Sequence, residues 1–388
     1  MNKVARREIP FGRPMIGDEE RAAVLKVLES PQLVHGPAAK AFESEFAASL
    51  GPGAHATSVS SCTAGLHLAY IHLGIGPGDE VIVPAETHVA TGHAVEITGA
   101  RPIFVDSDPR TGNIDTAKLE AAVTSRTKAI CVVHYLGLPV PMAEVMAVAR
   151  ERKLFVVEDC ALAIGASLDG VACGLLGDVA SFSFYPVKHM TTAEGGMVVS
   201  RHAGVVASIE NIKAFGYDRT LAERKVPGVY DIARLGINYR MNEIGAAIGL
   251  VQLKRVPDFA RARRENARAL RGYLADVEEL TLLPDGDKRA THANYCLGAV
   301  LGDAVGARRA EIITELKEHG VGVSVHYPVP LPLSKYYKGK YGADARAFPH
   351  ALRISNQSIA LPIGPHLTPD DMNVIASELK AAINKWKS

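Results

Sequence analysis

The sequence predicts an α/β protein with a large, mostly parallel sheet flanked by helices and a smaller α+β unit at the C-terminal end. Short apolar segments of strand length alternate with helical segments from about residue 57 to residue 158, which is typical of a parallel sheet with helices on both faces. Beyond about residue 241 this alternation ends. The chain has 388 residues, of which 47% are hydrophobic, and this is enough for two or three domains with a large core.

The elements of the large unit follow from local composition. An acidic first turn at Asp18 begins one expected helix, and residues 38–50 form a second. Short apolar runs rich in β-branched and aromatic residues predict strands over residues 80–84, 102–106, 129–134, 154–158, 179–184 and 196–200. The segments between them predict helices over residues 90–98, 116–123 and 142–152.

A long helix is expected to lead into the small unit. Residues 241–255 carry apolar side chains on one helical face, and an Arg- and Ala-rich stretch up to residue 271 continues the helix. Three arginines of this stretch are interpreted as a solvated helix face: Arg261, Arg263 and Arg264. A mixed segment follows and ends in a helix over residues 369–386. We therefore place the large unit, with its N-terminal arm, at residues 1–255 and the small unit at residues 256–388.

The charge balance and the cysteines exclude several classes of partner. There are 43 Lys and Arg residues against 42 Asp and Glu residues, so the net charge of +1 offers no general attraction for nucleic acid or an acidic membrane. The five cysteines have neither zinc-site nor redox-dithiol spacing, so we expect reduced thiols in a cytoplasmic protein and no metal site. No apolar run follows Lys3, Arg6 and Arg7 as it would in a signal peptide.

Four segments of the large unit suit one chemistry, that of a phosphate-bearing pyridine cofactor held as a Schiff base. The first, residues 60–65, places small residues and hydroxyls at a helix start, where backbone N–H groups bind phosphate. An ordinary capped helix has the same appearance. The second is an apolar strand that ends at Asp159. A carboxylate at this edge of a parallel sheet can keep a pyridine nitrogen protonated, or it can cap the next turn.

The third segment brings a lysine from an apolar strand into a polar turn. Lysine is rarely buried, and a partly desolvated Lys188 has the lowered pKa of an amine nucleophile, whereas most lysines are solvated surface groups. Ser183, five residues earlier, is within reach of the same cofactor's phosphate. The fourth segment, residues 235–243, places polar residues just before an amphipathic helix and by itself predicts a helix cap.

Together these segments resemble the pyridoxal-phosphate-dependent sugar aminotransferases (the DegT/DnrJ/StrS family), a fold type I branch of the aspartate aminotransferase superfamily. The resemblance covers nearly the whole chain. Its motifs are Ser61-Cys-Thr-Ala64, Gly76-Pro-Gly-Asp-Glu-Val-Ile-Val-Pro84, Glu158-Asp159, Gly177-Asp178, Phe182-Ser-Phe184, Pro186-Val-Lys188 with Glu194-Gly-Gly196, Gly236-Ile-Asn-Tyr-Arg-Met241, and His326-Tyr-Pro328 near Tyr336-Tyr337. It implies a large domain with a seven-stranded, mostly parallel sheet, a smaller C-terminal α+β domain, and pyridoxal 5′-phosphate (PLP) as cofactor.

The resemblance also implies roles for the positions that match the motifs. Lys188 would form the Schiff base with PLP and transfer the proton, and Asp159 would pair with the pyridine nitrogen. Thr63, Ala64 and Ser183 would hold the phosphate.

Further positions concern the substrate and a second copy of the chain. Asn238 would reach the phosphate of the neighbouring subunit's cofactor, so the active unit would be a homodimer with shared active sites. Arg240, His326 and Tyr327 would lie near the sugar.

Two positions depart from the family pattern, and two histidines lie near the motifs. His88 stands where an aromatic side chain usually stacks on the cofactor ring, and its imidazole offers a smaller face. Leu162 stands where Gln is common, so a hydrogen bond to the cofactor's 3-oxygen is expected to be missing or replaced. His134 and His189 are interpreted as structural residues.

The implied reaction transfers an amino group from L-glutamate to a keto-sugar, a nucleotide-linked 4-keto-6-deoxyhexose, in amino-sugar biosynthesis for lipopolysaccharide or another polysaccharide. A related deoxysugar dehydratase is one alternative, but those enzymes replace the lysine, often with His, and here Lys188 is present beside His189. A free keto-sugar acid such as 3-deoxy-octulosonate is an alternative substrate. A regulatory protein that binds PLP without turnover, and a structural scaffold without PLP, are alternatives from other classes.

Overall fold

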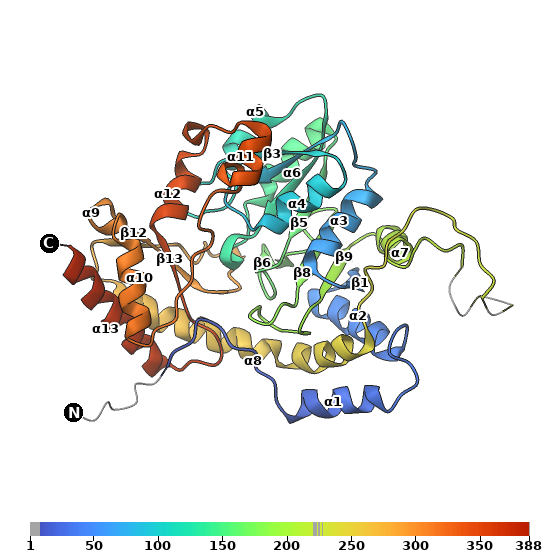
Figure 1. Ribbon diagram of the computed structural model, residues 1–388, viewed down its shortest axis with the longest axis horizontal. Coiled ribbons are helices and arrows are strands. Elements are labelled where there is room, and N and C mark those ends of the chain that lie inside the picture. The colour runs from blue at the N-terminus through green and yellow to red at the C-terminus, as the bar shows by residue number, and fades with distance from the viewer. Residues whose placement is uncertain (1–7, 220–222, 224–225, 227, 388) are drawn as a thin grey trace.

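The computed structural model describes residues 8–219, 223, 226 and 228–387 of the chain. These residues form a large unit around a seven-stranded sheet and a smaller unit on the left of Figure 1, which includes the C-terminal helix. The long helix α8 (Glu243–Leu274) runs across the lower part of the view, above α1 (Asp18–Leu28), and connects the two units.

The seven-stranded sheet confirms the predicted class. Its strands are β1 (His55–Val59), β2 (Glu80–Pro84), β3 (Arg101–Val105), β4 (Thr127–Val133), β5 (Phe155–Asp159), β8 (Val179–Ser183) and β9 (Gly196–Ser200). They lie in the order β1-β9-β8-β5-β4-β2-β3. β9 runs antiparallel to its neighbours β1 and β8, whereas β8, β5, β4, β2 and β3 are parallel to one another.

Helices cover both faces of this sheet because alternate side chains of each strand point to opposite sides. The helices of the large unit are α1 (Asp18–Leu28), α2 (Pro37–Leu50), α3 (Cys62–His72), α4 (Val89–Ile97), α5 (Leu119–Ala122), α6 (Met142–Arg152) and α7 (Ala203–Ile212), with short 3₁₀ turns at Thr116–Lys118 and Tyr135–Gly137. Val81 and Val83 pack toward α3, α4 and α7, whereas Ile82 packs toward α5 and α6. Phe182 of β8 and Phe184, directly after this strand, pack against α2 on this second face.

The small unit has its own core. Its elements are α8 (Glu243–Leu274), β10 (Leu280–Leu282), β12 (Leu297–Leu301), α9 (Asp303–Gly306), α10 (Arg309–Glu318), α12 (Pro349–Gln357), β13 (Ser358–Leu361) and α13 (Pro369–Trp386). Between α10 and α12 the chain returns to the large unit, where α11 (Lys335–Tyr341), flanked by 3₁₀ turns at Leu331–Leu333 and Ala345–Ala347, bonds to Glu96 of α4. β10, β12 and β13 form an antiparallel sheet, and α8, α10 and α13 cover it. A further small sheet joins β6 (Ser167–Leu168), β7 (Val171–Ala172) and β11 (Ala290–Thr291).

Besides α11, two segments depart from the proposed boundary between residues 255 and 256. The helix α8 continues through this point, and its N-terminal half packs on the large unit while its C-terminal half joins the core of the small unit. Ile9, in the N-terminal arm, bonds to Gly320 and Gly322 through its backbone and is 2% exposed in the same core. The arm therefore joins the small unit at this residue.

Arg263 corrects the expectation of a solvated arginine face. Its side chain is buried and donates to the carbonyl oxygens of Asn294 at 3.3 Å and Tyr295 at 2.7 Å. The reason is that α8 continues into the small unit, so one side of its Arg-rich stretch packs against that unit. Arg261 keeps the expected exposed position, in an ion pair with Asp258.

The predicted thiols are free in the structure. All five cysteines are unpaired and buried. Among the described helices, none combines the length and the apolar composition that crossing a membrane requires.

Candidate active site

A cavity of about 460 Å³ lies where the parallel strands β2, β4, β5 and β8 end, a size usual for small-molecule sites. It is lined by Ser61, Cys62, Thr63, Thr87, His88, Ala90, Val133, Asp159, Ala161, Leu162, Ser183, Tyr185, Val187, Lys188, Glu194, Gly195, Tyr295, His326 and Tyr327. Seven predicted site residues are in this set: Thr63, His88, Asp159, Ser183, Lys188, His326 and Tyr327. The other three, Ala64, Asn238 and Arg240, do not line it.

Lys188 provides an amine at the cavity wall. It follows β8 in a turn in which its backbone N–H donates to the Tyr185 carbonyl at 2.9 Å. Its Nζ lies 5.3 Å from the centre of the Tyr295 ring. Burial lowers the pKa of Lys188, which increases the fraction of neutral amine available to attack an aldehyde.

Asp159 provides a buried carboxylate at the end of β5. Its Oδ2 accepts a hydrogen bond from the Thr91 hydroxyl at 2.8 Å, and its Oδ1 accepts one from the Ala161 N–H at 3.1 Å. The Cys62 thiol lies 3.8 Å from Oδ1 and also contacts the Ser181 carbonyl. Donors on both oxygens hold the carboxylate in one orientation toward the cavity.

Glu158, next to Asp159, anchors the end of β5. Its Oε1 accepts from the N–H groups of Leu176 at 2.8 Å and Gly177 at 2.7 Å, and its Oε2 accepts from Gly174 N–H at 2.8 Å. His134 Nε2 is 2.9 Å from the same Oε2. The strand end that presents Asp159 is thus tied to its surroundings by a completely buried carboxyl group.

The start of α3 supplies hydroxyl and amide donors. Ser61 caps the helix, because its Oγ accepts a hydrogen bond from the Ala64 N–H at 3.1 Å. Ala64 therefore serves the cap, while the Thr63 side chain lines the cavity. Ser183, at the end of β8, lines the cavity as well. Hydroxyls beside a helix N-terminus form a suitable environment for a phosphate group.

His88 and Tyr327 meet at one side of the cavity. The His88 Nδ1 accepts from Ala90 N–H at 3.2 Å and caps α4, and the His88 ring lies 5.7 Å from the Tyr327 ring in an edge-on arrangement. Burial, together with the nearby Lys188, lowers the pKa of His88. The ring is therefore a neutral imidazole at neutral pH, at the position where the family usually has an aromatic ring.

The small unit contributes three side chains to the cavity, those of Tyr295, His326 and Tyr327. His326 packs 5.5 Å from the Tyr295 ring, and burial, followed by the charge of Lys188, lowers its pKa to about 4. The Tyr327 N–H donates to Glu86 Oε1 at 2.7 Å. The cavity is thus closed on one side by residues that lie more than a hundred positions after Lys188.

Asn238 and Arg240 lie outside this cavity, in the segment before α8. Asn238 pairs with Ala214 through a β-bridge. The Arg240 guanidinium lies over the Phe215 ring, 5.1 Å from its centre, and Arg240 lines a second cavity of about 550 Å³ together with Lys40 and others. Within one chain, these two residues are therefore not brought to Lys188.

His134 and His189 are held by the protein. Val140 N–H donates to His134 Nδ1 at 3.1 Å, so the hydrogen of this ring is on Nε2 and points at Glu158. The His189 Nε2 lies 3.0 Å from the Ala293 carbonyl. His134, Glu158 and Cys160 are close enough together to surround a metal ion, but hydrogen bonds already occupy both nitrogens of His134.

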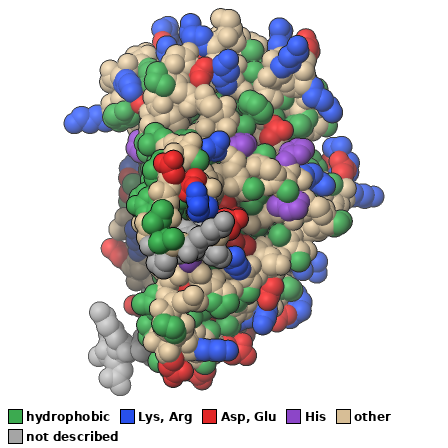
Figure 2. Space-filling model, turned by 90° about the vertical axis from the view of Figure 1, so that its right-hand side faces the viewer, with side chains coloured by type: hydrophobic (Ala, Val, Ile, Leu, Met, Phe, Trp, Pro, Cys, Tyr) green, Lys and Arg blue, Asp and Glu red, His purple; other side chains and the backbone are tan. Residues whose placement is uncertain are grey.

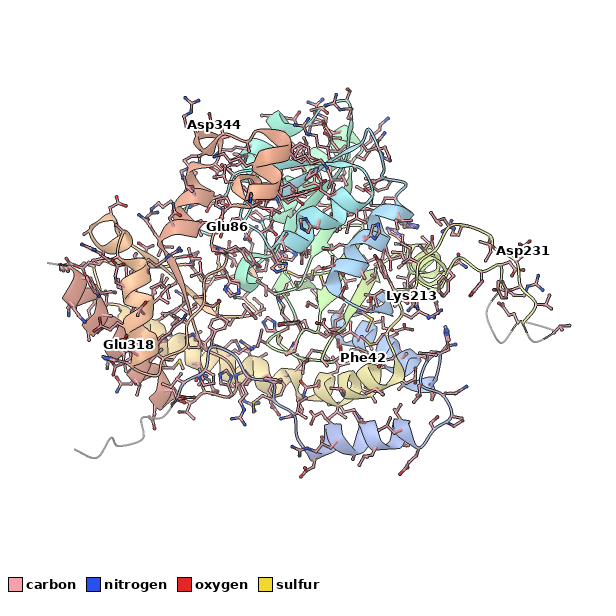
Figure 3. All side chains as sticks on the ribbon, viewed as in Figure 1. Phe42, Glu86, Lys213, Asp231, Glu318 and Asp344 are labelled. Atoms are coloured by element: carbon pink, nitrogen blue, oxygen red, sulfur yellow. The ribbon has the colours of Figure 1, made fainter. Side chains whose placement is uncertain are left out.

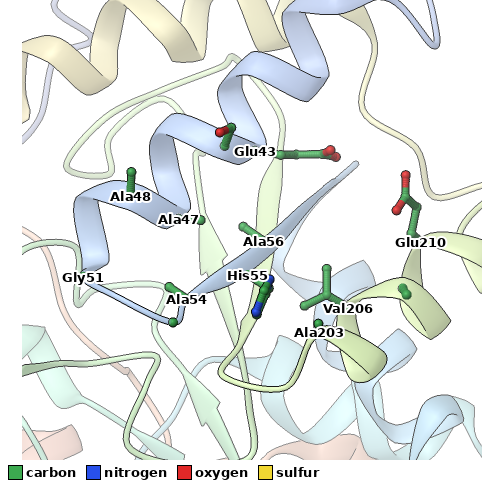
Figure 4. A pocket seen from close by; sticks show the side chains of 13 residues that line it. Glu43, Ala47, Ala48, Gly51, Ala54, His55, Ala56, Ala203, Val206 and Glu210 are labelled. Atoms are coloured by element: carbon green, nitrogen blue, oxygen red, sulfur yellow. The ribbon is translucent and has the colours of Figure 1, made fainter.

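A separate surface hollow of about 570 Å³ does not share this chemistry (Figure 4). It lies between α2, β1 and α7, and its polar side chains include Glu43, His55 and Glu210. Among its described lining residues there is no lysine or arginine, so it offers no amine nucleophile and no strong anion-binding group.

Three residues of the site were missed by sequence reasoning: Glu86, Thr91 and Tyr295. The hydroxyls of Thr87 and Thr91 are 2.7 Å apart. The two residues are four positions apart in the sequence, and this spacing, which brings side chains together at a helix, was a signal that could have indicated Thr91. Nothing in the neighbouring sequence marks Tyr295 or Glu86 as a site residue, because the residues that they contact lie in the other unit: Lys188 for Tyr295, and Tyr327 and Ser355 for Glu86.

The residues of the cavity fit PLP. The half-buried amine of Lys188, with its lowered pKa, suits the aldehyde, the Asp159 carboxylate suits a protonated pyridine nitrogen, and the hydroxyls of Thr63 and Ser183 suit the phosphate. Leu162, also at the wall, is 2% exposed and has no polar atom for the 3-oxygen.

Comparisons with known proteins agree with this chemistry. The sequence model of the DegT/DnrJ/EryC1/StrS aminotransferase family matches residues 14–380. SpsC of Bacillus subtilis, a spore coat polysaccharide biosynthesis protein, is 37% identical over 378 residues, which are 96% of this chain and 96% of SpsC. PseC of Helicobacter pylori, an aminotransferase involved in the biosynthesis of pseudoaminic acid, is 26% identical with a TM-score of 0.91, and the match covers 98% of this chain and 100% of PseC.

A third relative shows the cofactor. The PLP-form of Spr1654 from Streptococcus pneumoniae is 28% identical to this chain with a TM-score of 0.91, and the match covers 98% of this chain and 100% of Spr1654. The chain therefore belongs to the DegT/DnrJ/EryC1/StrS aminotransferase family and is a sugar aminotransferase that depends on PLP.

Proposed function

We propose that the protein transfers an amino group from L-glutamate to a nucleotide-linked 4-keto-6-deoxyhexose during polysaccharide biosynthesis. The observation that carries the proposal is the meeting of a half-buried lysine with a lowered pKa, Lys188, and a buried carboxylate, Asp159, in one cavity. The similarity to SpsC, a protein of polysaccharide biosynthesis, supports the pathway class.

The proposed roles follow from the groups that these residues present. When bound, PLP withdraws electrons from the carbon that carries the transferred amino group. Lys188 would hold the cofactor through its aldehyde, and the Lys188 Nζ would take the proton from the donor carbon and return it. Asp159 would stabilise the positive pyridine nitrogen, and the hydroxyls of Thr63 and Ser183 would face the phosphate, while Ala64 supports the helix start beside them through its bond to Ser61. His326 and Tyr327 contact the sugar.

A homodimer completes the proposed site. The described residues between α7 and α8 lie on the right in Figure 1. Several apolar side chains among them are exposed, including Phe215, Val229, Ile232 and Leu235, the last with 87% of its surface accessible. Figure 2 shows hydrophobic side chains on this face of the molecule. Such a surface favours burial against a second copy, which would bring Asn238 and Arg240 to the partner's cofactor and sugar.

The alternative reaction and the alternative substrate each make a different demand on the site. A deoxysugar dehydratase of the same family would lack the lysine, whereas Lys188 is present and lines the cavity. A free keto-sugar acid such as 3-deoxy-octulosonate needs no pocket for a nucleotide. We place the protein in the cytoplasm, because five free, buried thiols suit a reducing compartment.

The test is a two-stage reaction of the purified protein, followed through the absorbance of its bound cofactor. L-Glutamate is expected to convert the cofactor to its aminated form, and after glutamate is removed, a panel of keto-sugars is added. The panel contains UDP- and dTDP-linked 4-keto-6-deoxyhexoses and free 3-deoxy-octulosonate. We expect a nucleotide-linked sugar to restore the original absorbance and to yield an amino-sugar. A deoxygenated product, or reaction of the free acid alone, would refute the proposal.

A further inference from the structure

Glu86 is a buried carboxyl group that joins the two units beside the active site (Figure 3). It lies in the loop between β2 and α4 and is 1% exposed. Its Oε1 accepts from the backbone N–H of Tyr327 at 2.7 Å, and its Oε2 accepts from the hydroxyl of Ser355 in α12 at 2.7 Å. Because a carboxyl group is costly to bury, its retention here depends on these two bonds.

The segment that Glu86 holds is the one that carries the sugar-side residues. The carbonyl of His326 accepts a hydrogen bond from the Tyr135 hydroxyl, and the N–H of Leu331 donates to the Ala85 carbonyl at 2.8 Å. Residues 326–331 are therefore attached to the large unit at three points, and Glu86 makes the attachment nearest to Tyr327. His88, two residues after Glu86, contacts the Tyr327 ring.

We propose that Glu86 is a positioning residue for the sugar: it fixes Tyr327 and His326 of the small unit relative to His88 of the large unit, and so sets the shape of the sugar side of the cavity. This inference rests on the proposed function, in which that loop contacts the sugar. Glu86 does not line the cavity, so it acts through the Tyr327 backbone and not on the substrate itself.

The chemistry of the two partners indicates which substitutions are informative. The Tyr327 N–H can only donate, whereas the Ser355 hydroxyl can donate or accept. A glutamine side chain can therefore keep both hydrogen bonds. Its carbonyl oxygen accepts from the Tyr327 N–H, and its NH₂ group donates to the Ser355 hydroxyl, which then accepts instead of donating. Burial raises the pKa of Glu86 to about 7, in agreement with a site that tolerates the neutral form. Glu86→Gln is expected to keep the connection, and Glu86→Leu to remove it.

The chain offers a matched control at the other end of the same strand. Glu80 begins β2, is 1% exposed and accepts hydrogen bonds from Thr124 and Arg126. Glu80→Leu therefore removes a buried, hydrogen-bonded glutamate without touching the cavity. It measures how much of any effect comes from general loss of stability.

The first experiment separates the two half-reactions of the enzyme with bound PLP. The sugar probe is the panel member that the wild-type protein aminates fastest. We expect Glu86→Leu to raise the KM for this sugar about tenfold, the effect of losing one buried hydrogen bond, while the rate of the glutamate half-reaction changes less than about twofold. Glu86→Gln should recover most of the affinity. An equal effect of Glu80→Leu on the sugar KM, or an equal loss in both half-reactions of Glu86→Leu, would overturn the proposal.

A second measurement does not depend on the substrate. Amide hydrogen exchange is followed in the protein without sugar, over residues 324–333. Glu86→Leu is expected to increase exchange in this segment, and Glu86→Gln and Glu80→Leu are not. Unchanged exchange in Glu86→Leu would overturn the role of Glu86 even if no keto-sugar were aminated, whereas increased exchange without any sugar turnover would place the failure in the proposed function.

Discussion

Replacing Glu158 by glutamine tests whether the end of β5 is held by one buried carboxylate. Glu158 accepts four hydrogen bonds, from the backbone N–H groups of Gly174, Leu176 and Gly177 and from His134 Nε2. Glutamine has the same shape but a single acceptor oxygen. If this oxygen takes the place of Oε1, the new NH₂ group faces the Gly174 N–H and the His134 Nε2–H, and both donors lose their acceptor.

The expected cost follows from these two donors. Each lost hydrogen bond to a charged group in a buried site costs about 1.5–3 kcal/mol, so Glu158→Gln should lower the free energy of unfolding by about 3–6 kcal/mol. His134 cannot adapt by moving its hydrogen to Nδ1, because that nitrogen accepts from Val140 N–H. The loop over residues 174–177 should therefore open more often than in the wild-type protein.

The assay combines urea unfolding with amide hydrogen exchange at residues 174–177. Glu120→Gln is the control, because Glu120 is exposed and pairs with the exposed Arg152, and its change should stay within about 0.5 kcal/mol. The reasoning is refuted if Glu158→Gln unfolds like the control and the exchange of Gly174, Leu176 and Gly177 is unchanged.

Three further predictions concern the cavity. Lys188→Ala should abolish the absorbance of the lysine-bound cofactor and lower the amino-transfer rate by at least about 10²–10⁴-fold, the range for a lost acid–base group, and an unchanged spectrum would contradict the assignment. Thr91→Val removes one donor from Asp159 at nearly constant volume, so the rate of the glutamate half-reaction should fall about tenfold or more in stopped-flow traces, and Thr91→Ser should restore it. His326 has its pKa lowered from 6.5 to about 4, so the unfolded chain binds a proton here before the folded protein does; stability is complete above pH 6.5 and should decrease by about 3 kcal/mol between pH 6.5 and pH 4. His326→Asn should flatten this part of the pH profile of urea unfolding, and a profile parallel to the wild-type one would count against it.

Local sequence patterns predicted the large sheet well, because the side chains that make a segment a strand lie within that segment. The continuous burial of a strand such as residues 80–84 is encoded in the apolar side chains of that strand, and the lysine after residues 179–183 is visible as an anomaly in an apolar context. The cofactor-side residues lie at or soon after the ends of strands of this one sheet, so their meeting at its carboxyl edge follows from the fold class: Thr63, Asp159, Ser183 and Lys188.

Arg263 shows where local patterns do not suffice. In sequence it is one of three arginines in a polar stretch, and nothing nearby distinguishes it from Arg261 and Arg264. In the structure it is buried because the carbonyls of Asn294 and Tyr295 accept its hydrogen bonds. Partners about thirty residues away along the chain decide its burial, and helical periodicity does not contain them.

By itself the sequence determined the α/β class, the chemistry of Lys188 and Asp159 and, through its motifs, the family. The tertiary structure decided which residues complete the cavity: it brought Tyr295, His326 and Tyr327 of the small unit to Lys188, tied their loop to Glu86, and kept Asn238 and Arg240 outside the cavity of their own chain. The physical reason is the distance along the chain between the residues that interact. Strand and helix patterns arise from interactions over a few residues, whereas the packing of the two units depends on complementary surfaces and hydrogen-bond partners that no short segment specifies.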